Sequence, residues 1–426
     1  MTTEAIEAEI AQISLEIKRQ KDVLRKLESS KSLLQRQLNA SRDPIARLPV
    51  ELSSDIFLQC LPSNRGRREY HQARAHLAPL LLLNICHHWT NIALSTPALW
   101  ASIGIVFPRG RGFKDLLETW LRRAGSYHLR ISIGGVFDSL VARPILHHSA
   151  QLERLVISVD EANIDDEDEL FDLLGDVQLQ MELPGLQALE IFGQGGAEPE
   201  CFWISFHRLL RLSPNLTELT MQNISFMGNI NEEEPDTLVL PHLRHLTHLK
   251  NFDDIDWISA PRLETLHMET ESLFSSSLIS FLRCSSPPLW KLQLFGDSSS
   301  WFDSFEDSMA LIPTLTHLEL ACLNSALVEE LFNFLWQNPH HVPDLQTLDL
   351  DEVMICESTS PTTVLTALAD VLSLRRTRLK RVRFVIYPSG MPLPDDLTIF
   401  RELLADGMDI HIGLYHGPNI LSSSES

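Results

Sequence analysis

The first forty residues carry a narrow stripe of aliphatic side chains against a charged and polar background. The stripe recurs in alternating steps of four and three residues, at Ile6, Ile10, Ile13, Ile17, Leu24, Leu27, Leu34 and Leu38, with Gln20 and Lys31 in the two remaining places. An average step of about 3.5 residues is the period of a coiled coil. We predict one helix over residues 4–40. Its stripe favours pairing with a second helix, as in a homodimer through residues 4–40, over packing against the body of the same chain.

The next apolar block predicts two short helices. Proline ends the heptads at Pro44, and Pro49 predicts the first turn of a helix that ends near Pro62. Polar and basic residues 63–76 indicate a loop, and a second helix is expected from Leu77 to Leu94. This second helix is apolar on nearly all sides, so a module this small should leave apolar surface for a partner.

Residues 43–105 carry motifs that resemble the F-box. They are Pro44-Ile45, Leu48-Pro49, Glu51-Leu52 and Ile56-Phe57, then Cys86-x-x-Trp89-x-x-Ile92-Ala93, and last Thr96-Pro97-x-Leu99-Trp100. A Leu-Pro-x-Glu-Leu start and a Cys-x-x-Trp-x-x-Ile-Ala helix rarely occur together by chance. The layout of the whole chain is similar to that of F-box proteins of mushroom-forming (basidiomycete) fungi, which often join a short N-terminal coiled coil to this box and a leucine-rich tail.

This resemblance implies a substrate-recognition adaptor of a cullin–RING (SCF-type) ubiquitin ligase. The helical module would dock on the Skp adaptor subunit and the rest of the chain would bind a protein client, so the chain itself is not expected to be an enzyme. The residues implied at the adaptor contact are Leu48, Pro49, Leu52, Ile56, Phe57, Trp89 and Ile92, of which Trp89 is also suited to anchor the core. The alternative is a protein-interaction scaffold outside any ligase, in which these helices cap the N-terminal end of a repeat array.

The remainder of the chain repeats a Leu-x-x-Leu-x-Leu pattern. Its instances begin at residues 152, 186, 216, 243, 263, 289, 315, 345 and 379. The average spacing of about 28 residues lies in the range of leucine-rich repeats. Residues 99–107 and 129–133 look like earlier, degenerate strands, and the stretches at 325–337 and 363–374 look helical.

The predicted fold class is therefore α/β. In an extended segment the fourth and sixth motif residues point to the same side, so both enter the core while helices cover the outside. We expect a leucine-rich-repeat solenoid over residues 106–416, an irregular horseshoe of parallel strands with outer helices. It would follow an all-α F-box module and the N-terminal helix. Acidic loops are expected at 160–169 and 228–236, and a disordered tail at 417–426.

The strand positions that alternate with the core positions predict a client-binding concave face. The third, fifth and seventh motif positions supply the candidate residues Glu190, Phe192, Glu218, His267, Glu269, Phe295, His317, Glu319, Asp349 and Asp351. This acidic set with scattered histidine and phenylalanine predicts a basic, partly apolar client. The alternative interpretation is that strand positions facing solvent are polar in any case.

Composition narrows the choice of partners and compartment. The formal net charge of −22 disfavours nucleic acid and anionic membrane surfaces as partners. The six cysteines include no pair at metal-binding spacing, and with no signal-peptide pattern they suit the reducing cytoplasm or nucleus. The sequence has no glycine-rich phosphate loop and no Gly-x-Ser-x-Gly motif, and its histidine pairs lack carboxylates at ligand spacing. No catalytic, cofactor-binding or metal-binding residue is predicted.

Overall fold

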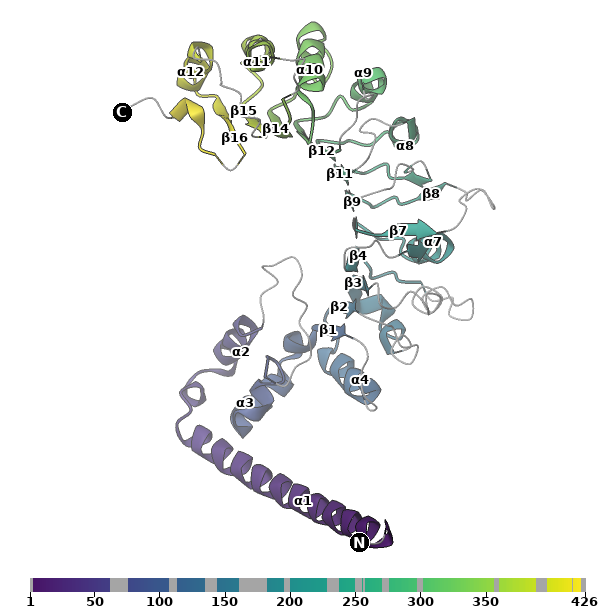
Figure 1. Cartoon of the computed structure of the whole chain (residues 1–426), viewed down its shortest axis with the longest axis vertical. Helices are drawn as coiled ribbons and strands as arrows, with labels where there is room; N and C mark the ends of the chain where they lie inside the picture. Colours follow the sequence, from purple (N-terminus) through teal and green to yellow (C-terminus); the bar gives the residue numbers. More distant parts are fainter. Residues whose placement is uncertain are drawn as a thin grey trace. The chain divides into compact units, whose positions relative to one another are not determined.

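The computed structural model in Figure 1 has an α/β fold with an N-terminal helix and a parallel sheet of twelve strands, which confirms the predicted class. It describes residues 3–61, 76–106, 113–134, 144–160, 182–194, 200–227, 237–249, 255, 257–269, 276–296, 302–355, 360–387, 397–415 and 417–422. The strand order in the sheet is β1-β2-β3-β4-β6-β9-β11-β12-β13-β14-β15-β16. The chain divides into two compact units, residues 1–106 with 110–132 (unit 1) and residues 107–109 with 133–426 (unit 2).

Unit 1 is mainly helical. Its elements are α1 (Thr3–Ser41), η1 (Ile45–Arg47), α2 (Val50–Gln59), η2 (Leu82–Asn84), α3 (His87–Ser95), η3 (Pro97–Trp100), β1 (Ser102–Val106), α4 (Phe113–Ala124) and β2 (Leu129–Gly134), in which the unit ends. The single helix predicted over residues 4–40, the helix start after Pro49 and the two early strands are confirmed. The unit extends beyond the predicted module boundary at residue 105, because it includes α4.

The helix predicted from Leu77 to Leu94 is wrong over its first half. Residues 76–86 form turns and the short η2, and α3 begins only at His87. Cys86, just before α3, is extended, with φ −156° and ψ 170°. Pro79 explains part of the difference, because proline cannot donate a main-chain hydrogen bond and disfavours helical geometry at the preceding residue. The loop predicted at residues 63–76 lies outside the described residues except for its last residue.

Two tryptophans form the centre of the unit 1 core. Trp100 is fully buried, and the ring of Trp120 meets it edge to face at a centroid distance of 4.9 Å. The Trp120 indole N–H donates to the carbonyl of Trp100 at 2.8 Å, and the Trp100 N–H donates to the carbonyl of Ala93 at 2.9 Å. Arg123 lies over the Trp100 ring at 4.7 Å. These contacts join α4 to α3 and η3. Each buried indole packs its ring against the other and has its N–H hydrogen-bonded to a main-chain carbonyl.

Unit 2 alternates strands with helices that lie along one side of the strands (Figure 1). Its elements are η4 (Ser149–Gln151), β3 (Leu152–Asp160), β4 (Ala188–Gln194), β5 (Glu200–Phe202), α7 (Trp203–Arg211), β6 (Glu218–Gln222), β7 (Ser225–Met227), β8 (Leu238–Val239), β9 (His245–Leu249), β10 (Ile258–Ser259), β11 (Thr265–Glu269), α8 (Ser276–Ser285), β12 (Lys291–Phe295), α9 (Phe302–Leu311), β13 (His317–Ala321), α10 (Ser325–Gln337), β14 (Thr347–Val353), α11 (Pro361–Arg375), β15 (Arg381–Ile386), α12 (Thr398–Ala405), β16 (Asp409–Leu414) and η6 (Ile420–Ser422). Each of the nine Leu-x-x-Leu-x-Leu segments forms a strand, and the helices predicted at 325–337 and 363–374 are confirmed as α10 and α11.

The strands of unit 2 pair in parallel and in register. The fourth motif position forms one continuous row, in which each side chain is at most 2% exposed: Leu189, Leu219, Leu246, Leu266, Leu292, Leu318, Leu348, Val382 and Ile410. No single repeat can bury its apolar face alone, so neighbouring repeats cover one another. The repeated leucines therefore form the core.

The C-terminal end of unit 2 differs from the prediction. Residues 417–422, called here the C-terminal cap, are ordered and bury Leu421, so the expected disordered tail is wrong for them, while residues 423–426 lie outside the described residues. The cap approaches β16 closely, since a Cβ at Gly413 would lie 2.9 Å from the carbonyl oxygen of Pro418. The acidic loops predicted at 160–169 and 228–236 fall outside the described residues, apart from Asp160 at the end of β3.

Candidate protein-binding surfaces

Exposed aliphatic side chains gather where the chain enters α2. Leu48 is extended and 37% exposed, and Pro49 precedes the first turn of the helix. Leu52 and Ile56 are also exposed, and they lie one turn apart on the same side of α2. This α2 surface, defined as Leu48, Pro49, Leu52 and Ile56, is the part of the predicted adaptor contact that the structure brings together on the outside of unit 1.

Three other residues predicted at the adaptor contact have internal roles. Phe57 is 0% exposed and Ile92 is 3% exposed, so the expectation that they touch a partner directly is corrected. Trp89 is half-buried, and its ring lies 4.9 Å from that of Phe57. Its indole N–H donates to Asp43 at 2.8 Å, as expected for a core anchor. Phe57, Trp89 and Ile92 therefore support the surface of α2 from inside.

Asp43 is a residue of this module that sequence reasoning missed. Its Oδ1 accepts hydrogen bonds from the main-chain N–H of Ile45 at 2.9 Å and from Trp89, and its Oδ2 lies 3.9 Å from the sulfur of Cys86. The carboxylate thereby joins the end of α1 to the start of α3. Its place just before Pro44 was the available signal, because aspartate at such a position often bonds the main chain two residues on.

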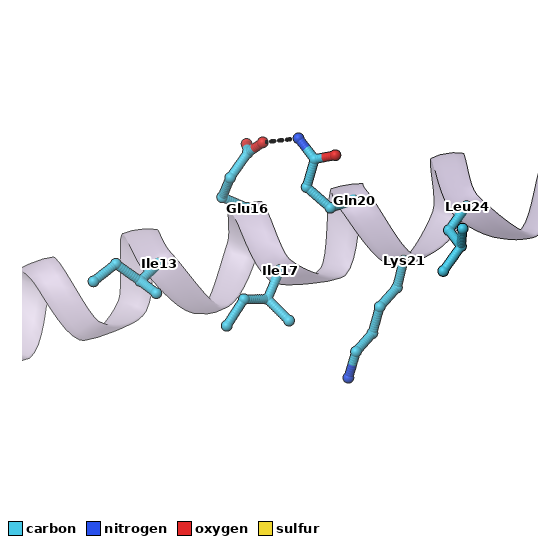
Figure 2. A pocket seen from close by; sticks show the side chains of 6 residues that line it. All are labelled: Ile13, Glu16, Ile17, Gln20, Lys21 and Leu24. Atoms are coloured by element: carbon cyan, nitrogen blue, oxygen red, sulfur yellow. Dashed lines mark hydrogen bonds between the residues drawn. The ribbon is translucent and has the colours of Figure 1, made fainter.

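A second apolar surface runs along α1. The aliphatic stripe residues from Ile6 to Leu38 are each at least 44% exposed. A hollow of about 390 Å³ lies along this stripe and is shown in Figure 2. Its lining consists of Ile13, Glu16, Ile17, Gln20, Lys21 and Leu24. Large exposed apolar surfaces of this kind mark interaction sites in folded proteins.

The predicted client residues lie on the strand face of unit 2, away from its core. All ten are partly exposed at alternate strand positions: Glu190, Phe192, Glu218, His267, Glu269, Phe295, His317, Glu319, Asp349 and Asp351. Their spacing along a parallel register places side chains of neighbouring strands next to one another. The ring of His267 stacks on that of Phe295, with centroids 4.9 Å apart and planes 14° from parallel.

The acidic residues of this face are interleaved with basic and amide partners. Arg154 forms ion pairs with Glu190 and, at 3.6 Å, with Glu218. Asp351 pairs with Arg383 at 2.8 Å, and Glu319 accepts a hydrogen bond from Gln293. The strand face is therefore of mixed charge rather than purely acidic, because the basic residues on β3 and β15 lie beside the carboxylates.

Asp349 and His317 lie on the neighbouring strands β14 and β13 of the strand face. Asp349 Oδ1 is buried and has no hydrogen-bond partner among the described residues. Burial raises the pKa of Asp349, and Glu319 raises it as well, whereas Arg381 and Arg383 lower it. Burial and then Lys291 lower the pKa of His317, whose Nδ1 lies 2.8 Å from the hydroxyl of Thr316. The sequence contained no signal for this burial, which depends on neighbouring strands.

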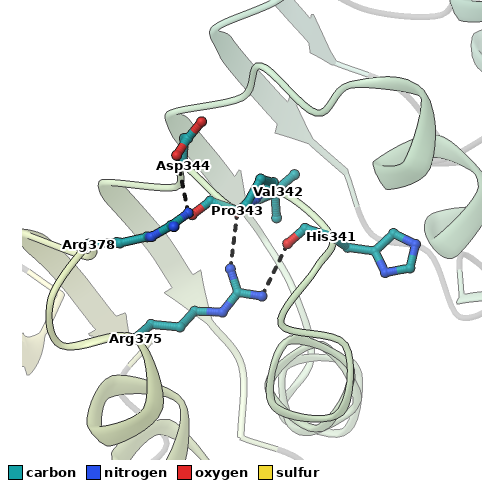
Figure 3. A network of polar contacts seen from close by, with 6 residues as sticks. All are labelled: His341, Val342, Pro343, Asp344, Arg375 and Arg378. Carbon is teal, nitrogen blue, oxygen red and sulfur yellow. Dashed lines mark hydrogen bonds and ion pairs between the residues drawn. The ribbon is translucent and has the colours of Figure 1, made fainter.

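A second polar network, shown in Figure 3, is structural. The buried guanidinium of Arg375 donates to the carbonyls of Leu335, Asn338, His341 and Val342 at 3.1–3.3 Å. Burial lowers the pKa of Arg375, and neighbouring Arg378 lowers it further. These carbonyls lie at the end of α10 and in the turn that follows, where helix carbonyls lack main-chain partners. The arginine therefore stabilises a helix end rather than binding a ligand.

Within the described ranges, no group of three or more histidine, cysteine or acidic side chains is placed to hold a metal ion. No described helix is both long enough and apolar enough to cross a membrane. In comparisons with known proteins, no family model matches the chain and no curated protein matches it.

Proposed function

We propose that this chain is a non-catalytic adaptor, an F-box protein with leucine-rich repeats that brings a protein client to a cullin–RING ubiquitin ligase. In this proposal the α2 surface docks on the Skp adaptor subunit and the strand face of unit 2 binds the client. The observation that carries it is the exposure of Leu48, Pro49, Leu52 and Ile56 beside the buried Phe57 and the half-buried Trp89. An apolar contact supported from inside by aromatic residues is suited to a stable protein interface.

The leucine-rich-repeat part of the proposal draws its support from unit 2. Nine strands begin at the repeated motif and pair in parallel register, and they bury the fourth motif position in all nine and the sixth in eight. Helices α8 to α12 lie along one side of the strands (Figure 1). This arrangement leaves the other side of the strands available, and broad strand faces of repeat proteins serve as binding surfaces.

The proposed mechanism requires no chemistry from this chain. Binding a client at one surface and a ligase subunit at another raises the effective concentration of the client's lysines near the ubiquitin-charged enzyme. The mixed charge of the strand face favours a client whose own charges are patterned rather than uniformly basic. Such an adaptor would act in the cytoplasm or nucleus.

The adaptor contact is tested by co-expressing the full chain with a Skp subunit, followed by affinity capture and size-exclusion chromatography. We expect a one-to-one complex with the unaltered chain. The double variant Leu48→Ala with Pro49→Ala should weaken the complex by roughly 50-fold, because about 2–3 kcal/mol of apolar contact is lost. Its fold should survive, since both side chains are exposed.

The matched control is Leu116→Ala on α4, where the leucine is 39% exposed, close to the 37% of Leu48. This control should leave the complex intact. Unchanged capture of the double variant would contradict the assignment of the α2 surface. A well-folded unaltered chain that elutes alone would instead favour the scaffold outside any ligase.

A further inference from the structure

Helix α1 contacts the rest of unit 1 through the side opposite its aliphatic stripe. Arg36 donates to the carbonyl of Leu83 at 3.0 Å and to the side chain of Asn84 at 3.1 Å. Asn39 donates to the carbonyl of Ile85 at 3.0 Å. In the heptad notation abcdefg, with Ile10 at a and Ile13 at d, Arg36 falls at f and Asn39 at b, on the outer side of a coiled coil. The anchoring contacts therefore leave the stripe free.

The hollow in Figure 2 coincides with the positions that meet a partner in a coiled coil. Its six lining residues are Ile17 and Leu24 at a, Ile13 and Gln20 at d, Lys21 at e and Glu16 at g. In two-stranded coiled coils, side chains of one helix insert between four residues of the other, and e and g flank that seam. Glu16 and Gln20 are joined by a hydrogen bond of 2.6 Å on one rim of the hollow. The hollow has the composition of a helix-binding seam.

We propose that the occupant of this seam is α1 of a second copy of the chain, running antiparallel, with Gln20 of each copy opposite Lys31 of the other. In this register Ile13 meets Leu38, Ile17 meets Leu34, and Leu24 meets Leu27 of the second copy. The two-fold symmetry repeats each pair, as a closed dimer requires. Each aliphatic side chain of the stripe from Ile13 to Leu38 then faces another aliphatic one, and the two polar seam residues face each other.

The two polar seam residues select this register. Sliding one helix by a heptad in one direction sets Lys31 against Ile13 and Gln20 against Leu24 of the second copy. Sliding it the other way sets Lys31 against Leu27 and Gln20 against Leu38. Polar groups that lose water without gaining a partner are costly, whereas the amide oxygen of Gln20 can accept from the ammonium of Lys31.

The charges select the antiparallel direction. A parallel, in-register pair would place Lys31 against Lys31 of the second copy inside the seam, and like charges there repel. The flanking charges are attractive in both directions, since Lys21 lies opposite Glu28 of the second copy in the antiparallel pair and opposite Glu16 in the parallel one. The repulsion between the two Lys31 side chains therefore decides the direction. The paired segment, residues 10–41, lies within α1.

The association is measured on the full chain by sedimentation equilibrium. We expect dimers of twice 48.3 kDa. Leu24→Ala should weaken dimerisation by roughly 100-fold, because each dimer loses two buried leucines. The matched control is Leu15→Ala, which removes an exposed leucine at position f on the outer side of the helix and should leave the dimer unchanged. A monomeric unaltered chain, or a trimer or tetramer, would overturn the proposal.

Charge-reversal variants test the direction. In the antiparallel pair both K21E and E28K should weaken the dimer by roughly fivefold, and the double variant K21E/E28K should restore it, because opposite charges again face each other. In a parallel pair E28K would face Val23 and have little effect, while the double variant would stay weak because its residue 21 would face Glu16. The parallel pattern would overturn the proposal. Either result leaves the adaptor test above unaffected, since that test concerns the α2 surface.

Discussion

Asp349 illustrates how a single carboxyl on the strand face responds to its neighbours. Its Oδ1 is buried without a hydrogen bond among the described residues, and burial raises its pKa above the ordinary value of 3.8. The folded state then holds the proton more tightly than the unfolded state does. Stability therefore falls as pH rises from 3.8 through the folded pKa, and the full cost is present at neutral pH.

Replacing this carboxyl should stabilise the protein at neutral pH. We expect Asp349→Asn to raise the free energy of unfolding at pH 7 by less than about 1 kcal/mol, because the amide carries no charge to desolvate. The gain should shrink towards pH 4, where the carboxyl is increasingly protonated. Urea denaturation at both pH values measures it, with Asp370→Asn on the exposed side of α11 as control. A gain of equal size at both pH values would contradict the account.

His317 has the opposite dependence on pH. Burial lowers its pKa below 6.5, so the unfolded chain binds the proton more tightly and stability is lost as pH falls below 6.5. We expect His317→Gln to reduce this loss between pH 7 and pH 5.5, because glutamine stays neutral over that range. Thermal melts at both pH values, with the exposed His340 changed to Gln as control, measure the difference. An unchanged slope of stability against pH would show that another group titrates there.

At the scale of elements, Arg375 joins α11 to the end of α10. A buried guanidinium bonded to four main-chain carbonyls cannot be replaced by a shorter cation without losing partners. We expect Arg375→Met to lower the free energy of unfolding by about 3 kcal/mol, since several buried carbonyls lose their donors. The free energy of unfolding of Arg375→Lys should lie between that of the unaltered chain and that of Arg375→Met. Chemical denaturation measures the change, and Arg376→Met at the neighbouring exposed position should cost little.

The elements that the sequence predicted well are those with a local repeated pattern. The leucine spacing located nine strands, because alternate strand positions must enter one core. It missed β16, where Gly407 stands at the first motif position with φ +94° in place of leucine. It also extended α3 too far back, because a run of leucines around Pro79 looks helical by composition.

The candidate surfaces could not be predicted fully from the sequence, because they depend on how segments far apart in the chain pack together. Ile56 and Phe57 are neighbours in the same motif, yet Ile56 is exposed and Phe57 is fully buried. Which of the two faces outward depends on where α3 packs, and the start of α3 was itself mispredicted. On the strand face, residue types identified the acidic positions. Their pairing with Arg154 and Arg383 required the register of strands far apart in the chain.

At the scale of the whole molecule, the last strand of the sheet has its free edge covered. Asn419 in the C-terminal cap accepts from the main-chain N–H of Ile412 at 3.1 Å and donates to the carbonyl of Ile410 at 2.8 Å. Both groups belong to β16, the final strand in the sheet order. The cap thus uses the groups with which another strand would pair.

Removing this side chain should make the protein prone to associate through β16. We expect Asn419→Ala to give concentration-dependent aggregation, because it frees main-chain donors and acceptors at an open edge. Static light scattering over a range of concentrations measures it, and it is best done with Leu24→Ala present so that dimerisation through α1 does not contribute. Asn338→Ala, at the end of α10, serves as control. Scattering that matches the control would show that the cap residue does not protect the edge.

The C-terminal cap also limits how this chain can lengthen in evolution. A repeat appended after residue 422 would meet a strand whose hydrogen-bonding groups Asn419 already occupies. Between interior strands, in contrast, each new strand would find the same row of aliphatic side chains on both sides, as Leu292 finds Leu266 and Leu318. Gene duplications that change the size of the strand face should therefore be internal, with the terminal strand and its cap carried along unchanged.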